Sequence, residues 1–425
     1  MAQTQNGSHE PRTNVRHGSL RRSSAWANAG KVALTAVLTL ALSSVAVVSY
    51  AVLGLVNDVD TVDLVPPSGP EAIGAGQQSI DGAFSILLVG SDSRQGQKSI
   101  DDGEQGQLND VNLLLHVSED HKIATVISFP RDLMVPIPSC PGPDGQPNYY
   151  SAMSEQQINT TLMYGGLPCT VLTISALTGI PIDYAGLITF DGVVAMSNAI
   201  GGVQVCLTQP IVDAHTNLDL PAGLNNLEGL EALQFLRTRH GVGDGGDTSR
   251  ISNQQVFMSA MMRQVKSADT LTNPVKVYSL ASAAIKNMQL SSNMATVSFL
   301  QGIAGAVKDI DLDSVNFVQY PSARHPYMAG RLTPDRTNGQ MLVDVVMSGR
   351  PFEITGTGVG VVTKDDGTTP STPGGTDGGT SGGTSGGTSG GTDSGTDAEK
   401  PVKLPTNITG QKASDETCSA GRTVF

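Results

Sequence analysis

The residues most suggestive of chemistry are arginines near the middle of the chain. Arg237 and Arg239 lie two positions apart, and Arg250 and Gln254 follow at the spacing of one helical turn. If Leu236 ends a helix, the next segment is extended and both arginines point to the same side. Guanidinium groups bind phosphate oxygens bidentately through charge-assisted hydrogen bonds. The pattern predicts a phosphate-binding site, with a solvated basic stripe as the alternative.

Two aspartates stand at the ends of apolar runs and could share a cation. Asp92, with Arg94 two residues later, follows the run 84–89, and Asp110 directly precedes the run 111–115. Binding groups in open α/β sheets gather at the carboxyl ends of strands, and Mg²⁺ takes carboxylate and phosphate oxygens. We therefore predict Mg²⁺ or Mn²⁺ at Asp92 and Asp110. A polar turn and a water-facing acid are the alternatives.

Arg131 follows a third apolar run, 123–129, after Pro130. Because proline ends ladder pairing, Arg131 projects from the end of the strand. It is a further candidate for the phosphate site, although a surface salt bridge with Asp132 is the alternative.

A long uncharged stretch near the start of the chain predicts a membrane anchor. Residues 32–56 carry no charged side chain and are long enough to cross a bilayer as a helix. The alternative, a cleaved signal peptide, has a shorter apolar region. Basic residues precede the stretch, so residues 1–31 are predicted to be cytoplasmic and the rest of the chain extracytoplasmic.

Charge and cysteine content agree with an exported domain. The net charge of −13 argues against nucleic-acid binding, which requires a basic footprint. All four cysteines follow the predicted anchor and none lies in a CxxC pair, which favours disulfides over metal thiolates. Three pairings are open. We favour Cys140–Cys169 and Cys206–Cys418, because the first two flank one short region; free buried thiols are the alternative.

Strand and helix patterns alternate along residues 82–352. Apolar runs predict strands over 84–89, 111–117, 123–129, 203–207 and 315–320. Helical patterns cover 153–164, 168–178, 191–199, 227–236, 249–265, 294–307 and 337–347. This order predicts an α/β fold with a central mixed β-sheet flanked by helices on both faces. Residues 57–81 are predicted to be a linker, and 353–425 a Gly/Thr/Ser-rich disordered tail ending in a segment around Cys418.

Taken together, these clusters resemble the LytR–CpsA–Psr family of cell-envelope proteins, specifically its actinobacterial members. The resemblance is strong over residues 82–268 and weaker to about 352. It rests on the order and spacing of several short motifs. These are Gly-Ser-Asp-Ser-Arg (90–94), Asp110 before an apolar strand, Ser-Phe-Pro-Arg-Asp (128–132), Phe-Asp-Gly (190–192), Ile-Gly-Gly-Val (200–203), Arg-Thr-Arg-His (237–240) and the stretch 247–254.

The resemblance implies a phosphotransferase that moves a glycopolymer, arabinogalactan or a similar one, from a polyprenyl-pyrophosphate carrier onto peptidoglycan. It implies that Asp92 and Asp110 hold Mg²⁺ on the pyrophosphate. The phosphate ligands that it implies are Arg94, Arg131, Arg237, Arg239, Arg250 and Gln254. The predicted catalytic residues are Arg131, Arg237, Arg239 and Asp247. The general base of the transfer is open between Asp132 and Asp247, and a metal-assisted attack needs no strong base.

Three positions depart from the family pattern. Leu108, Gln157 and Asn253 stand where many members carry a basic residue, which implies a less cationic site. Two other functions are compatible with the same residues: a pyrophosphatase acting on the lipid pyrophosphate, and a non-catalytic envelope regulator that binds polyprenyl phosphate. The sequence has no P-loop, no GxSxG nucleophile elbow outside the low-complexity Gly/Thr/Ser repeats and no HExxH motif, so it gives no support to NTPase, serine hydrolase or zincin activity.

Overall fold

The chain divides into two compact units, Met1–Gly54 and Leu55–Phe425. A computed structural model describes residues 29–31, 59–64, 80, 82–94, 97–100, 106–142, 145–267, 273–296, 299, 302, 303, 305, 306, 309–363 and 400–422. The predicted anchor at 32–56 lies outside the described residues, as do parts of the helix predicted over 294–307. Both expectations remain predictions.

One helix among the described residues, Ile158–Thr178, is long and apolar enough to cross a membrane. More than half of its apolar stretch is buried inside the domain. Cys169 within it is also bonded to Cys140. The helix therefore belongs to the core of the folded domain.

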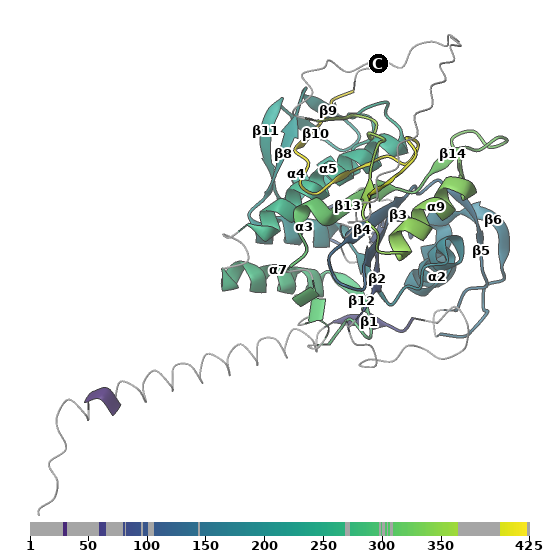
Figure 1. Ribbon diagram of the computed structural model, residues 1–425, viewed down its shortest axis with the longest axis horizontal. Helices are drawn as coiled ribbons and strands as arrows, with labels where there is room; N and C mark the ends of the chain where they lie inside the picture. Colours follow the sequence, from purple (N-terminus) through teal and green to yellow (C-terminus); the bar gives the residue numbers. More distant parts are fainter. Residues whose placement is uncertain are drawn as a thin grey trace, which may run out of the picture. The chain divides into compact units, whose positions relative to one another are not determined.

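The main sheet has eight strands in the order β1-β12-β7-β2-β3-β4-β13-β19 (Figure 1). The strands are β1 Asp60–Val62, β2 Phe84–Ser91, β3 Asn109–Val117, β4 Ala124–Phe129, β7 Tyr184–Ile188, β12 Met288–Ser291, β13 Val315–Gln319 and β19 Gly410–Lys412. The pairs β2–β3 and β3–β4 are antiparallel, whereas β2–β7 and β4–β13 are parallel. The sheet is mixed, as predicted.

The two faces of this sheet are covered by different helices. Along β2, Leu87 and Val89 pack into one core and Ile86 and Leu88 into another, because successive side chains of a strand point to opposite faces. The first core also takes side chains from α2 Thr161–Thr178 and α9 Arg336–Met347. Over the opposite face lie α3 Phe190–Ile200, α4 Gly229–Arg237, α5 Asp247–Lys266 and α7 Pro274–Lys286 (Figure 1). The predicted α/β architecture is confirmed.

A second, four-stranded sheet joins distant parts of the chain. Its order is β11-β8-β20-β17, formed by Gly223–Leu227, Val203–Leu207, Thr417–Ser419 and Val361–Thr363. Cys206 of β8 is bonded to Cys418 of β20, and the other disulfide joins Cys140 to Cys169. Both favoured pairings are confirmed.

The folded domain extends beyond the boundaries predicted at residues 82 and 352. The Gly/Thr/Ser-rich residues 364–399 lie outside the described residues, so their disorder remains a prediction. Within the predicted linker, β1 pairs with β12, and within the predicted tail β18 Val402–Lys403 pairs with β16 Phe352–Glu353. The strands β19 and β20 likewise belong to the two larger sheets. Such two- or three-residue strands carry no periodic signal, because partners far away in the sequence decide whether they form.

The helix predicted over 153–164 is also wrong in its first half. Residues Met153–Gln157 form β6, which pairs with β5 Met134–Ile137, and the helical part begins at Ile158. Pairing with β5 overrides the helix preference of glutamate and glutamine. Within α2 the backbone breaks at Gly165, where an added Cβ would lie 3.0 Å from the Cβ atoms of both Cys140 and Cys169. The elements β7, β12 and α7 were not predicted from the sequence.

Candidate active site

Asp110 occupies a β-bulge at the edge of the site. In the β2–β3 ladder Gly90 pairs with Val111 and Ser91 with Asn109, so Asp110 has no partner opposite. A bulge of this kind redirects a side chain, and bulges are common beside active sites. The bulge brings the Asp110 carboxylate to the carboxyl end of β2, where Asp92 follows the strand.

Asp92 is held in place by the backbone that leads into β3. Its Oδ1 accepts a hydrogen bond from Leu108 N at 2.7 Å, and its own N–H donates to Leu108 O at 3.0 Å. Burial raises the pKa of Asp92, and the charge of Asp110 adds to the rise, against the hydrogen bond from Leu108. Two neighbouring carboxylates of this kind favour a cation between them.

Four side chains form a network of ion pairs that we call the paired half of the site. Arg131 Nη1 lies 2.5 Å from Asp110 Oδ1, and Arg250 Nη2 lies 2.7 Å from Asp247 Oδ1. Two longer ion pairs connect these two: Arg131 Nε is 3.8 Å from Asp247 Oδ1, and Arg250 Nη1 is 3.9 Å from Asp110 Oδ2. Arg131 Nε also pairs with Asp132 at 3.7 Å, as the alternative expected, but both side chains are largely buried and Asp110 is the nearer partner of Arg131.

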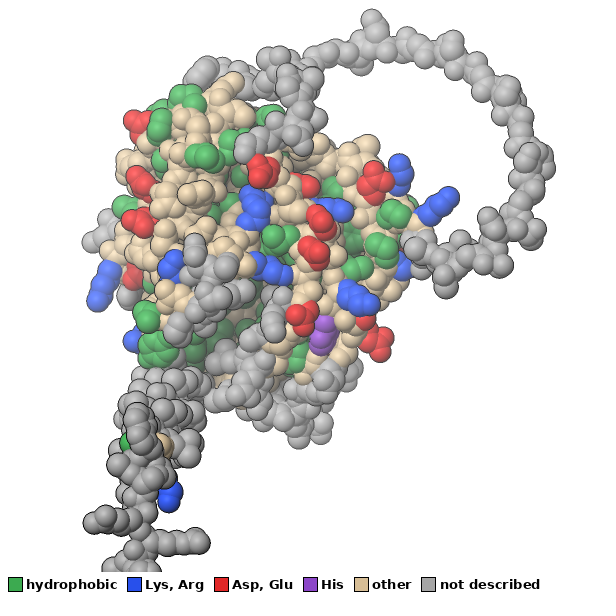
Figure 2. Space-filling model, turned by 60° about the vertical axis from the view of Figure 1, so that its left-hand side comes forward, with side chains coloured by type: hydrophobic (Ala, Val, Ile, Leu, Met, Phe, Trp, Pro, Cys, Tyr) green, Lys and Arg blue, Asp and Glu red, His purple; other side chains and the backbone are tan. Residues whose placement is uncertain are grey.

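The network is largely buried and fixes the charge of Asp110. Only 4% of the Arg250 side chain and 8% of the Asp247 side chain are exposed. Burial by itself raises the pKa of Asp110, but the charges of Arg250 and Arg131 outweigh burial and hold the pKa below its ordinary value. Figure 2 shows charged side chains of both signs interleaved on one face of the domain.

Arg239 lies beside the paired half, where the charges of Arg131 and Arg250 act on it. Burial and the like charges of Arg131 and Arg250 lower the pKa of Arg239. Among the residues that the structure describes, it forms no ion pair within 4.0 Å. Since Asp110 and Asp247 already balance Arg131 and Arg250, Arg239 gives this side of the site an excess positive charge.

Phe190 organises what we call the stacked half of the site. The guanidinium carbons of Arg94 and Arg237 each lie 4.7 Å from the centroid of the Phe190 ring. An aromatic ring attracts a cation placed over its face and leaves the N–H groups at the edge of the guanidinium available to other acceptors. Arg94 follows β2 and Arg237 ends α4, so one ring aligns arginines 143 positions apart in sequence.

The expected parallel fork of Arg237 and Arg239 is not formed. It required a helix ending at Leu236, but α4 continues through Arg237 and only Thr238 is extended. Arg237 therefore lies over Phe190, while Arg239 faces the charges of Arg131 and Arg250. The two arginines serve different halves of one site.

The beginning of α3 also tethers the loop that follows Asp92. The Asp191 carboxylate accepts hydrogen bonds from Lys98 N at 2.9 Å and Ser99 N at 2.8 Å. In return, Gln97 Oε1 accepts from Asp191 N at 3.0 Å. The Phe-Asp-Gly motif thus positions Arg94 and Arg237 through its phenylalanine. Its aspartate holds the loop that follows Arg94.

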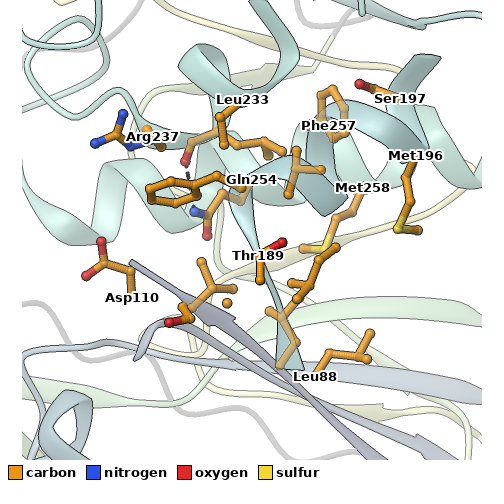
Figure 3. Close-up of a pocket in the computed structure, with 18 of the residues that line it drawn as sticks. Leu88, Asp110, Thr189, Met196, Ser197, Leu233, Arg237, Gln254, Phe257 and Met258 are labelled. Carbon is orange, nitrogen blue, oxygen red and sulfur yellow. Dashed lines mark hydrogen bonds between the residues drawn. The ribbon is translucent and has the colours of Figure 1, made fainter. Parts of the chain in front are cut away.

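A cavity of about 230 Å³ lies between β2 and β3 on one side and α3, α4 and α5 on the other. Its polar end is formed by Asp110, Arg237, Arg250 and Gln254. Figure 3 shows Asp110 and Arg237 at one end and Met196 and Met258 towards the other. Further apolar lining comes from Leu88, Leu113, Val193, Leu233, Phe257, Met261 and Met288. The cavity therefore joins a charged mouth to an apolar interior.

Gln254 and the residue before it tie α5 to the end of α4. Gln254 Nε2 donates to Leu236 O at 2.9 Å, and Asn253 Nδ2 donates to Phe235 O at 2.8 Å. Asn253 Oδ1 accepts from Ser419 Oγ of β20 at 2.6 Å and is buried. Asn253 is therefore engaged away from the cavity, so its departure from the family pattern bears on packing against β20. Gln157, at another such position, donates to Asp132 at 2.9 Å.

A model of the LytR_cpsA_psr family matches residues 63–341, about two thirds of the chain. The chain belongs to the LytR–CpsA–Psr family. The cell wall biosynthesis protein LcpA of Corynebacterium glutamicum is 31% identical over 306 residues, covering 64% of this chain and 57% of LcpA. The polyisoprenyl-teichoic acid–peptidoglycan teichoic acid transferase TagT of Bacillus subtilis is 29% identical over 195 residues, covering 44% of this chain and 55% of TagT. The chain thus matches between half and two thirds of each relative.

A solved member of this family has the same fold. The LytR-Csp2A-Psr enzyme from Actinomyces oris superposes with a TM-score of 0.51 at 22% identity, covering 68% of this chain and 95% of that chain. At this identity the likeness concerns the fold alone.

The structure brings the predicted residues of this family member together around one cavity mouth. Asp92 and Asp110 are neighbours, Arg131, Asp247 and Arg250 form one network with Asp110, and Gln254 lines the cavity. Sequence reasoning gave no role to Phe190 or to the methionines of the interior. Their apolar side chains at helical spacing are indistinguishable from core residues in the sequence.

Proposed function

We propose that this protein transfers a glycopolymer from a polyprenyl-diphosphate carrier to a hydroxyl group of peptidoglycan. The observation that carries the proposal is the cavity whose apolar interior ends at clustered arginines and carboxylates. A lipid diphosphate has the same two parts: a hydrocarbon chain and a compact anionic group. The names of the relatives, a cell wall biosynthesis protein and a teichoic acid transferase, support the same reaction class.

The apolar interior suits an isoprenoid chain. Methionines from three elements, α3, α5 and β12, line it together with leucines and a phenylalanine. Methionine side chains are flexible and polarisable, so they adapt to an irregular hydrocarbon such as a branched, unsaturated chain. Burial of this chain would fix the position of the diphosphate at the cavity mouth.

The arginines would bind and activate the diphosphate. In the proposed step, the acceptor oxygen bonds to the phosphorus that carries the glycan, and the bond from that phosphorus to the bridging oxygen breaks. Polyprenyl phosphate leaves with the bonding electron pair, and the hydroxyl proton is released to solvent. Negative charge develops on the transferring and leaving phosphates, and fixed guanidinium groups stabilise that charge without reorganisation. We assign this role to Arg239, Arg131 and Arg250, and the binding of the resting diphosphate to Arg94 and Arg237.

The carboxylates fit a divalent cation that is shared with the substrate. Among the described residues there is no group of three or more His, Cys, Asp or Glu side chains suited to a metal, so a cation at Asp92 and Asp110 requires phosphate oxygens as further ligands. The raised pKa of Asp92, caused by burial and by Asp110, is relieved by such a cation. Bound there, Mg²⁺ or Mn²⁺ would supply Lewis-acid stabilisation of the diphosphate.

For Asp247 we propose a positioning role in place of proton abstraction. Its carboxylate is buried and lies 2.7 Å from Arg250 and 3.8 Å from Arg131. The Asp132 carboxylate is similarly engaged, by Gln157 and Arg331 at 2.9 Å each. Both aspartates orient arginines or neighbouring strands, which is consistent with an attack that needs no strong base.

We further propose that residues 32–56 anchor the protein in the cell membrane, with the domain on the extracytoplasmic side. This placement puts the cavity where a membrane-embedded lipid carrier and the wall are both accessible. The polymer is proposed to be arabinogalactan or a similar glycan, on the resemblance to actinobacterial family members.

The test is an assay of the purified full chain with a polyprenyl-diphosphate-linked oligosaccharide, with and without Mg²⁺ and peptidoglycan glycan chains. Transfer predicts a phosphodiester-linked product and polyprenyl phosphate, formed only when both additions are present. Release of a free glycosyl phosphate without transfer would identify a pyrophosphatase, and an unchanged donor would identify a binding protein. Either of these two outcomes contradicts the proposal.

A further inference from the structure

A chain of polar contacts leads away from the site, on the side opposite the cavity. Asp132, which follows Arg131, accepts hydrogen bonds from Gln157 Nε2 of β6 and from Arg331 Nη1, each at 2.9 Å. Leu332 N also donates to Asp132 O at 3.0 Å. These contacts join the Arg131 segment to the hairpin of β14 Ser322–Arg324 and β15 Leu332–Pro334.

The tip of this hairpin has a fixed conformation. His325 Nδ1 accepts hydrogen bonds from the backbone N–H groups of Tyr327 and Met328, at 3.2 Å and 3.1 Å. Because Nδ1 is an acceptor, Nε2 carries the proton and donates to Glu155 Oε1 of β6 at 3.2 Å. One histidine thus closes the turn and attaches it to the neighbouring strand.

This rigid tip presents an aromatic ring to solvent. Tyr327 is 91% exposed, the largest exposure among the large apolar and aromatic side chains that the structure describes. Its ring meets only the edge of His325, with the centroids 6.2 Å apart. Tyrosine buries a large apolar area when it is part of a core, so this ring contributes little to the stability of the fold. A fixed, exposed aromatic ring is suited to contact with a ligand.

The hairpin and the cavity lie on opposite faces of the main sheet, which is the arrangement that the acceptor of the transfer requires. Leu133 and Leu332, which link Arg131 to the hairpin, pack in the core shared with α2 and α9. The cavity uses Leu88 and Leu113, which belong to the opposite face of the sheet. In phosphoryl transfer the nucleophile and the leaving group lie roughly in line on opposite sides of the phosphorus. If the leaving lipid phosphate comes from the cavity, the acceptor approaches from the hairpin.

We propose that the surface running from Asp132 across β6 to Tyr327 binds the acceptor glycan, with a sugar ring stacked on Tyr327. The inference rests on the proposed transfer reaction and names the binding surface of its second substrate. Figure 1 shows β6 and β14 side by side, away from α3 and α7.

The chemistry of this surface fits a glycan better than a lipid or a protein. One face of a sugar ring presents C–H groups to an aromatic ring, while the hydroxyl groups at its edge bind carboxylates and amides. Glu155 is exposed and Gln156 and Gln157 are partly exposed beside the hairpin, so planar polar groups flank the tyrosine. A protein or membrane interface would require a larger continuous apolar patch.

The experiment compares the full chain with Tyr327→Ala and Tyr327→Trp in the transfer assay, varying donor and acceptor concentrations separately. Loss of one aromatic contact predicts a roughly five- to tenfold higher KM for peptidoglycan glycan chains in Tyr327→Ala. The KM for the donor stays unchanged, and Tyr327→Trp restores acceptor affinity. Tyr278→Ala on α7, 45% exposed, is the matched control and leaves both values unchanged.

An unchanged KM for the acceptor in Tyr327→Ala overturns the inference. A rise in the KM for the donor alone would assign the surface to the donor glycan and would also overturn the inference. A titration of wild type and Tyr327→Ala with the peptidoglycan glycan alone separates this inference from the proposed function. Binding that is weakened by Tyr327→Ala supports the surface even if no transfer occurs. Equal binding by wild type and Tyr327→Ala overturns the inferred acceptor surface, whether or not transfer occurs.

Discussion

The two halves of the site hold their arginines by different means. In the paired half, Arg131 and Arg250 are fixed by Asp110 and Asp247, so two positive charges meet two negative ones. In the stacked half, Arg94 and Arg237 are aligned by Phe190, an uncharged ring. Ion pairing gives strong positional restraint but cancels charge, whereas an uncharged ring positions a guanidinium group without itself adding a negative charge.

A diphosphate site needs both properties. The paired half is anchored to the core through buried groups, so it can keep its geometry before substrate arrives. The stacked half contributes two guanidinium groups aligned over Phe190, and Arg239 adds a further positive charge beside Arg131 and Arg250. The comparison predicts that substitutions in the paired half damage the fold as well as the reaction, while substitutions in the stacked half or at Arg239 damage only the reaction.

The largest effect on turnover is expected for Arg239→Ala. Removal of a preorganised donor from a developing anion lowers kcat by roughly 10²- to 10³-fold. The melting temperature is expected to stay near that of wild type, because Arg239 forms no ion pair among the described residues and is repelled by the like charges of Arg131 and Arg250. Steady-state kinetics and thermal unfolding measure the two quantities. Arg239→Lys keeps the positive charge but lacks the planar guanidinium group, so its kcat should lie between those of wild type and Arg239→Ala. Near-normal turnover of Arg239→Ala would contradict the proposed role of Arg239.

Arg250→Met tests the paired half. It leaves the buried Asp247 without its nearest cation and is expected to destabilise the domain by about 3 kcal/mol, in addition to lowering turnover. Thermal unfolding of the full chain in detergent measures the loss. The control is Lys122→Met, which removes an exposed pair with Asp120 and is expected to cost less than about 1 kcal/mol. Equal losses in the two variants would remove the distinction between the halves.

Phe190→Leu tests the stacked half with a smaller expected effect. It removes two cation–π contacts of about 0.5–1 kcal/mol each, so the donor KM rises roughly five- to thirtyfold while kcat changes less. Phe190→Trp retains an aromatic face and should preserve donor affinity. A fall in kcat with an unchanged donor KM would show that Phe190 acts in the chemical step instead.

The smallest effect concerns Asp92, which lies between the two halves. Burial raises the pKa of Asp92, so the folded protein holds this proton more tightly than the unfolded chain does. That contribution to stability is complete below the ordinary aspartate pKa and is lost as pH rises through the raised pKa.

Asp92→Asn, which mimics the protonated form, should therefore melt at a higher temperature than wild type at neutral pH without divalent cations. The difference should vanish in acid, where wild-type Asp92 is protonated. Added Mg²⁺ should raise the melting temperature of wild type more than that of the variant. Scans at several pH values, each with and without Mg²⁺, check these expectations. A variant less stable than wild type at neutral pH would show that Asp92 is stabilised as an anion.

Much of the fold was predictable, because long apolar runs and regular helical patterns report burial directly. The central strands β2, β3 and β4 and the helices α3, α4, α5 and α9 were found near their observed bounds. The strands β1, β18, β19 and β20 were not, because each has only two or three residues and forms only when distant partners are already in place. For the same reason the sequence did not reveal the strands that residues 400–422 add to the folded domain.

The sequence by itself determined the inventory of the site: two aspartates at strand ends, several arginines at motif positions, and the four cysteines that pair. Only the tertiary structure decided which arginine meets which partner. Arg237 stacks on Phe190 and Arg239 faces Arg131, although the two are neighbours in sequence. The physical reason is that one residue more of helix redirects a side chain by about 100°, and sequence patterns fix helix ends only to within a few residues.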